Sequence, residues 1–396
     1  MIDRRMLMAG GAGFAGSAAL KPHQAFADPP TTYNDAVRSI WAPLRVDGGP
    51  KELVRYATLA VNSHNTQPWT FRISEGRIAI APDFSRRCPA VDPDDHHLFV
   101  SLGCAAENLV HAAAAVGLNA VPELVDTTVS ISLEPAPPTR SPLFEAIPIR
   151  QSTRAVYDGK PVANETLRLL EQAGTVDGVA VTIMTDRTKI DSVADYVVEG
   201  NSAQMRDAAF MSELKGWLRF NDADALATMD GLFSRASGSP ALPRWLVGLL
   251  LRLVFNERGE NDKYLAQIRS SSGVAVFVSN RSDKMHWLEA GRACQRFALQ
   301  ATALGLKCAF INQPVEVAAI RGQFAAFLGV GDRRPDLVMR FGYGPELPKS
   351  LRRPVGQVIL KQAPAEAREC NDAGSDCQGW HQLPDRDPQH DAGTAV

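Results

Sequence analysis

The chain lacks the short motifs that are typical of the commonest hydrolases, nucleotide-binding enzymes and zinc proteins. It contains no G-x-S-x-G, no H-E-x-x-H and no Walker sequence, and none of its six cysteines forms a C-x-x-C pair. A serine hydrolase, a zinc protease, a P-loop NTPase, a thioredoxin-type enzyme and a zinc ribbon therefore have no support in the sequence.

The chain also lacks a strong charge bias and a long apolar run. Its formal net charge is −2, which gives no attraction to nucleic acid or to an anionic membrane surface. Beyond the N-terminus the most apolar run, 245–255, is interrupted by Arg252, so we expect no membrane span. With 396 residues, 45% of them hydrophobic, the chain is long enough for two domains or one large double unit.

The N-terminus contains GAGFAG (11–16), which fits the G-x-G-x-x-G pattern of dinucleotide-binding folds. That pattern requires a preceding strand, and the few residues after Arg5 leave no room for one. The paired arginines, the apolar stretch 6–20 and Ala-Phe-Ala at 25–27 are instead typical of an export signal. We expect residues 1–27 to be a twin-arginine-type signal, which implies the export machinery as a partner and a periplasmic or other extracytoplasmic location.

The six cysteines raise the question of disulfides in an exported protein. Cys104, Cys294 and Cys308 lie in apolar patterns, so we expect buried free thiols. Cys370 and Cys377 lie in a polar tail and are the only pair for which we predict a disulfide. That tail, 363–396, has no hydrophobic periodicity and is predicted to be disordered.

Two stretches of the chain resemble each other. Gly103–Leu118 and Gly291–Leu306 have glycines at equal spacing and alanines at matching positions. Each predicts a helix with a face of small residues, able to pack closely on a neighbour and closed by a glycine. Two unrelated alanine-rich helices are the simpler alternative.

A second correspondence extends the repeat. Residues 51–60 and 165–174 each predict a helix that is followed by strand-like sequence. The spacing between the copies is about 114 residues here and about 188 residues at the glycine-flanked helices, so the second copy has gained about 74 residues. The added sequence has apolar helical segments joined by Gly, Ser and Pro, and we expect a lid at about 200–265.

The most informative stretch is Ser63-His64-Asn65-Thr66-Gln67-Pro68-Trp69, at the junction between a predicted helix and a predicted strand. Short polar side chains there could bond the edge of a flat polar ring, or could simply cap the turn. The stretch resembles the PSxxNxQPW signature of the nitroreductase superfamily, although Val61-Asn62 replaces Pro-Ser. The resemblance implies FMN as the cofactor, bound in part by Ser63, Asn65 and Gln67, and it leaves Trp69 as a structural residue.

Further similarities follow along the chain. Arg150-Gln151-Ser152-Thr153-Arg154 resembles the superfamily's R-x-S-x-R/K phosphate-binding segment, and two guanidinium groups with a hydroxyl group could surround one phosphate. After the second repeated helix, Asn312 falls where the superfamily lines the flavin. Arg352, after a strand-like stretch ending near Tyr343, resembles its last phosphate-binding arginine.

The two copies carry complementary parts of one site. The first has the Ser63–Trp69 signature, and the second has the Arg150–Arg154 segment, whereas superfamily homodimers combine one of each from two subunits. The chain thus resembles the Acg-like subgroup, single-chain pseudo-dimers with one FMN under a lid. The implied fold is α+β, with two fused half-units (28–145 and 146–362), each a mainly antiparallel sheet flanked by helices. We expect a monomer.

Residues 92–97, Asp-Pro-Asp-Asp-His-His, resemble a metal-binding cluster. Adjacent histidines point to different faces of a regular element and acidic residues favour a helix start, so we expect no metal here. Two functions fit the whole sequence. One is an FMN oxidoreductase that accepts electrons from a small donor and passes them to a small acceptor, with no side chain identified as catalytic. The other is an FMN storage protein with little or no turnover.

Overall fold

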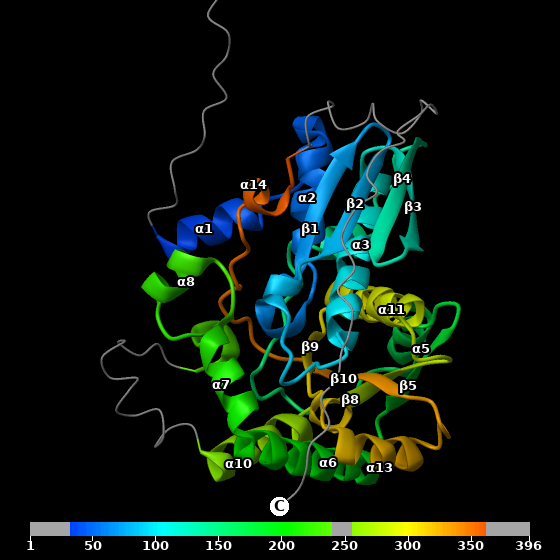
Figure 1. Ribbon diagram of the computed structural model, residues 1–396. Helices are drawn as coiled ribbons and strands as arrows, with labels where there is room; N and C mark the ends of the chain where they lie inside the picture. Colours follow the sequence, from blue (N-terminus) through cyan, green and yellow to red (C-terminus); the bar gives the residue numbers. More distant parts are fainter. Residues whose placement is uncertain (1–31, 240–255, 362–396) are drawn as a thin grey trace, which may run out of the picture.

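A computed structural model describes residues 32–239 and 256–361 (Figure 1). The predicted signal 1–27, the predicted tail 363–396 with Cys370 and Cys377, and the apolar run 245–255 lie outside the described residues. The predicted lid, at about 200–265, lies partly outside them, because residues 240–255 are not described.

The first sheet contains four strands in the order β1-β2-β4-β3, and every neighbouring pair is antiparallel. A tight turn joins its first hairpin, where Gly76 has a φ of +63° that a glycine adopts without strain. In chain order, α1 and α2 precede this sheet, α3 lies between β2 and β3, and α4 follows β4. The bounds are α1 (Tyr33–Ile40), α2 (Pro50–Thr58), β1 (Trp69–Ser74), β2 (Arg77–Pro82), α3 (His96–Ala115), β3 (Leu118–Val125), β4 (Thr128–Pro135) and α4 (Pro142–Ala146).

The second sheet contains four antiparallel strands in the order β5-β8-β10-β9. Its two central strands, β8 and β10, are buried along their whole length; the sequence of β8 is nearly all apolar, whereas β10 also buries Asp336 and Arg340. The bounds are α5 (Asn164–Gly174), β5 (Val179–Met184), α6 (Arg187–Arg206), α10 (Glu257–Arg269), β8 (Gly273–Ser279), α11 (Lys284–Ala303), β9 (Lys307–Phe310), α12 (Gln313–Glu316), α13 (Ala318–Leu328), β10 (Pro335–Gly342) and α14 (Val355–Val358). Two antiparallel sheets with flanking helices confirm the α+β class.

The two repeated helices, α3 and α11, cross at the centre of the molecule (Figure 1). A methyl group on Gly103 would lie 2.0 Å from the carbonyl oxygen of Leu288, and one on Gly291 would lie 2.0 Å from that of Val100. Each carbonyl belongs to the residue three positions before the other glycine, so the contact is reciprocal. The predicted close packing of small residues is confirmed, but the helices begin one to two turns before these glycines, at His96 and Lys284.

Short elements in the predicted lid range connect α6 to α10. They are α7 (Ala208–Trp217), β6 (Leu218–Arg219), α8 (Asp222–Thr228) and β7 (Leu232–Phe233). A small apolar cluster joins this segment to α1, where the rings of Tyr33 and Phe233 lie 4.7 Å apart between centroids. The lid segment is therefore packed against the first half of the chain.

Among the described residues, α3 is long and apolar enough to cross a membrane by composition, but 83% of its most apolar window is buried inside the protein. This is the pattern of a core helix. Cys104, Cys294 and Cys308 are buried and free, as expected from the sequence, and Trp69 is fully buried.

Candidate functional site

The Ser63–Trp69 signature forms an irregular loop between α2 and β1. Three of its residues have positive φ angles, 45° at His64 and 54° at both Asn65 and Gln67. Such angles are uncommon outside glycine and persist where the surroundings enforce them. The Asn62 side chain accepts a hydrogen bond from the backbone N–H of Gln67 at 2.9 Å, which helps to close the loop.

Two adjoining cavities lie beside this loop. The larger one has a volume of about 280 Å³, and the smaller one has about 50 Å³. They share four lining residues from the loop, the second half and the lid segment, namely Val61, Asn62, Arg154 and Leu232. Together they form one elongated site that runs from the lid to the Arg150–Arg154 segment.

The smaller cavity is strongly basic. The described residues that line it include four cationic side chains and no carboxylate. Arg150, Ser152, Arg154 and Arg352, all expected from the sequence, meet here, and Lys349 joins them. Cations gathered in a buried site without a negative partner favour the binding of an anion.

Arg150 and Arg352 are 4% and 5% exposed, and both donate to the carbonyl oxygen of Leu59 at the end of α2. Burial lowers the pKa of both guanidinium groups, and the nearby Arg150 lowers that of Arg352 further. The Arg150 Nε is buried without a hydrogen-bond partner among the described residues. The helix end supplies partial negative charge only, so a negatively charged ligand would complete this site.

The basic segment is held in place by its own neighbours. Ser152 forms a parallel bridge with Cys308 of β9, and the N–H of Thr153 donates to the Cys308 carbonyl at 2.8 Å. The fully buried Arg340 of β10 donates to the carbonyls of Thr153 and Ala155. These contacts fix the backbone and leave the side chains of the segment toward the cavity.

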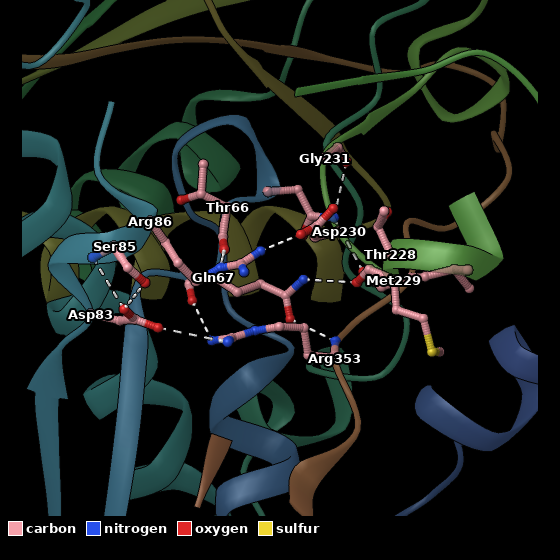
Figure 2. Close-up of polar contacts among 12 residues, drawn as sticks. Thr66, Gln67, Asp83, Ser85, Arg86, Thr228, Met229, Asp230, Gly231 and Arg353 are labelled. Carbon is pink, nitrogen blue, oxygen red and sulfur yellow. Dashed lines mark hydrogen bonds and ion pairs between the residues drawn. The ribbon is translucent and has the colours of Figure 1, made fainter. Parts of the chain in front are cut away.

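The amides of Asn65 and Gln67 are bonded to the protein itself, although Asn65 also lines the smaller cavity. The Asn65 amide donates to the carbonyls of Gly231 and Leu351 and accepts from Arg352, so its hydrogen-bonding capacity is used by the protein. Gln67 is fully buried and lines neither cavity among the described residues. Its amide donates to the carbonyl of Met229 and accepts from the Arg353 N–H, as Figure 2 shows. Both ends of the Gln67 amide are thus bonded to the protein, one of them to the lid.

An ion-pair network fastens the lid segment next to this loop (Figure 2). Asp230 is 8% exposed and accepts from Arg86 and from Arg219, the latter at 2.6 Å. Arg86 also donates to the carbonyl of Thr66, so it joins the lid to the signature loop. This group of contacts, Arg86–Asp230–Arg219 with Gln67 and Met229, is called the lid latch below.

The larger cavity is lined by polar and apolar side chains from both the body of the protein and the lid. Ser63 and Asn312 line it, as expected; the Asn312 Oδ1 accepts a hydrogen bond from the Val338 N–H at 2.9 Å. The lid contributes apolar side chains, namely Phe210, Leu214, Leu218, Phe220 and Leu232. This composition suits a flat, largely apolar ligand with polar edges.

No family model matches the chain. A Mycobacterium tuberculosis H37Rv protein named for NAD(P)H nitroreductase activity, Rv3131, is 26% identical over 321 residues, which span 76% of this chain and 89% of the relative. The protein named acg in the same strain, also named as an NAD(P)H nitroreductase, is 24% identical over 328 residues, spanning 79% and 96%. These relatives support the nitroreductase superfamily for this chain.

Solved nitroreductase structures align with part of the chain. The FMN-dependent nitroreductase NfnB of Mycobacterium smegmatis, in complex with NADPH, has a TM-score of 0.36 and 16% identity, covering 57% of this chain and 96% of that one. A nitroreductase with bound FMN from Desulfitobacterium hafniense also has a TM-score of 0.36, with 10% identity, covering 57% and 100%. Because these scores are low, the similarity to nitroreductases rests on the curated relatives.

Two parts of the site were not expected from the sequence. Lys349 stands three positions before Arg352, and the basic spacing K-x-x-R-R is the one signal that could have indicated it. Ser234, Ser237 and Ser239 of the lid line the larger cavity. A Gly/Ser-rich linker gives no sign of which cavity it will reach, so these serines could not be found in advance.

Proposed function

We propose that the protein is an FMN-dependent oxidoreductase of nitroreductase type that holds one FMN per chain in the two adjoining cavities. The observation that carries this proposal is the smaller cavity, where four cationic side chains meet no carboxylate among the described lining residues. FMN has a phosphate dianion at one end and a flat ring at the other. The basic and the largely apolar cavities adjoin in the same order.

The two cavities would bind different parts of FMN. Arg150, Ser152, Arg154, Lys349 and Arg352 would hold the phosphate. The residues of the larger cavity would enclose the ring, with Ser63 and Asn312 at polar edges. Bound FMN supplies hydride acceptance from a donor and electron transfer to an acceptor. NAD(P)H is the donor class that the names of the relatives suggest.

Export fits this function as part of the same proposal. A twin-arginine-type signal at 1–27 suits a protein that folds around its cofactor before transport. The export machinery would then be a partner, and the working location would be periplasmic or extracytoplasmic. We expect the chain to act as a monomer, because α3 and α11 from the two halves already form the central contact.

The alternative is that the chain stores or sequesters FMN. Five apolar side chains of the lid line the larger cavity, and the lid latch joins the lid to the signature loop. A lid fastened in this way would retain the flavin and would hinder a bulky donor. The retention of FMN and its reduction by NADPH are therefore separate questions.

The experiment is an absorbance spectrum of the purified protein, followed by anaerobic addition of NADPH and then of dithionite. Flavin bands that bleach with NADPH support the oxidoreductase. Bands that bleach only with dithionite, a small reductant, support storage. A protein that carries no flavin and takes up none from added FMN would refute both functions.

A further inference from the structure

Five side chains outside the phosphate-binding cavity form a buried cluster between the two halves. They come from the loop before α3, from the first turn of α3, from α12 and from β10. One ligand-type atom from each of Asp92, His96 and His97 lies within 4.8 Å of the other two. Asp336 and Glu316 complete the cluster.

The sequence argument against a metal here holds only in part. Asp92 does start the helix, because its carboxylate accepts from the N–H groups of His97 and Leu98 at 3.0 Å. The two histidines do not diverge, however. Their ring centroids lie 4.8 Å apart, and both Nε2 atoms reach Asp336.

Asp336 sets the tautomer of both rings. The His97 Nε2 lies 3.3 Å from the Asp336 backbone carbonyl, which can only accept, so this nitrogen carries the proton. The His96 Nε2 lies 2.9 Å from one carboxylate oxygen of Asp336, whose other oxygen accepts from the Ser279 N–H at 2.6 Å. Both rings are therefore left with a lone pair on Nδ1.

Those lone pairs have no protein donor. The His96 Nδ1 is buried, on a residue 1% exposed, without a hydrogen-bond partner among the described residues. The His97 Nδ1 lies 4.0 Å from a carboxylate oxygen of Glu316, which is beyond hydrogen-bond distance. An imidazole held through its other nitrogen by a carboxylate is the usual arrangement around a protein-bound metal.

We propose that Asp92, His96 and His97 bind a divalent first-row transition-metal ion, with Glu316 as a fourth ligand and Asp336 orienting both histidines. Two imidazole nitrogens and carboxylate oxygens are a ligand set that suits Zn²⁺ and its neighbours. A tetrahedral site with metal–ligand distances of about 2.0–2.1 Å needs ligand atoms about 3.4 Å apart, so the side chains close inward on binding. His97 and Glu316 also line the larger cavity, which places the ion at its wall.

The test uses the full chain, purified through a tag without histidine and treated with a chelator. Co²⁺ is titrated in and followed by its visible ligand-field absorption, and Zn²⁺ is then added as a competitor. We expect one Co²⁺ per chain, displaced by one Zn²⁺. Wild-type protein that shows no ligand-field bands with excess Co²⁺ overturns the proposal, without reliance on any variant.

The variants locate the ion. His96→Gln and His97→Gln keep an amide donor for Asp336 but lose the Nδ1 lone pair, and each should weaken Co²⁺ binding by at least about 100-fold. Asp336→Asn should weaken it by about 10- to 100-fold. His286→Gln is the matched control, because His286 forms a similar His–Asp contact elsewhere, at 2.7 Å from Asp283. Equal Co²⁺ affinity in His96→Gln and His286→Gln would also overturn the proposal.

Discussion

Arg154 offers the sharpest test of the phosphate site, because its guanidinium group lines both cavities and has no hydrogen bond to any residue in 32–239 or 256–361. Burial lowers its pKa, so the empty protein gains little from its charge. Arg154→Gln should therefore leave the stability of the flavin-free protein unchanged or slightly raised. It should weaken FMN binding by about 1.5–3 kcal/mol, the range for a hydrogen bond to a charged group, or about 10- to 150-fold in Kd.

The assay measures the quenching of flavin fluorescence when FMN or riboflavin is added to the flavin-free protein. Riboflavin lacks the phosphate, so its affinity should not change in Arg154→Gln. Arg168→Gln is the control, because the Arg168 side chain is 64% exposed and pairs with Glu165 on the surface of α5. An equal loss of affinity for both flavins, or no loss for FMN, would refute the assignment of Arg154 to the phosphate.

Three further tests concern the lid latch, two helical glycines and Lys349. Asp230→Asn removes the charge at the centre of the lid latch. It should speed FMN release by at least about tenfold, which is within the free energy that a buried hydrogen bond to a charged group contributes. Asp222→Asn is the control, because Asp222 belongs to an exposed ion pair of the lid, and it should leave the release rate unchanged. Stopped-flow measurement of FMN release compares the two variants, and equal release rates in both would contradict the lid latch. Gly103→Ala places a methyl group 2.0 Å from a carbonyl oxygen and should lower the free energy of unfolding by about 3 kcal/mol. Gly322→Ala, on α13 with open space around it, should raise that free energy by about 0.5–1 kcal/mol, and urea denaturation measures both. Burial lowers the pKa of Lys349 to about 8, with the nearby arginines adding to the shift, so its ammonium group loses its proton above pH 8 in the flavin-free protein. FMN affinity should then fall as the pH rises above 8 and Lys349→Met should flatten this decline, whereas parallel profiles would show that another group titrates.

The sequence predicts local features of this fold well where one helix or loop determines them. Asp92 is recognisable as a helix start because its carboxylate bonds the N–H groups of the very next turn. The helix-closing glycines are recognisable because Gly117 and Gly305 adopt φ angles of +82° and +78°, which other residues avoid. Such features depend on a few consecutive residues, so a short sequence pattern is enough to predict them.

Structural features that depend on contacts between distant segments are harder to predict from the sequence. The partner of Gln67 is a carbonyl 162 residues away, on a lid whose docking is decided by packing against α1. Helix geometry predicts that the side chains of His96 and His97 diverge, but Asp336 of β10 contacts both rings. Arg150 and Arg154 are four positions apart with Ser152 between them, and all three line the smaller cavity, so this group of residues depends on one short segment of the sequence.

The signature loop shows why a motif can locate a site without giving the contacts of each atom. Three positive φ angles in four residues cost of order 1–3 kcal/mol each, and Asn tolerates such angles better than most residues. Hydrogen bonds from Asn65 and Gln67 to the lid and to the segment that precedes α14 offset this cost. The amides of Asn65 and Gln67 therefore bond the protein itself, next to Val61 and Asn62, which line both cavities. Gln67→Glu should therefore loosen the lid and speed FMN release, as Asp230→Asn does. The ratio of the affinities for FMN and riboflavin should stay unchanged. A change in that ratio would indicate that Gln67 contacts the ligand.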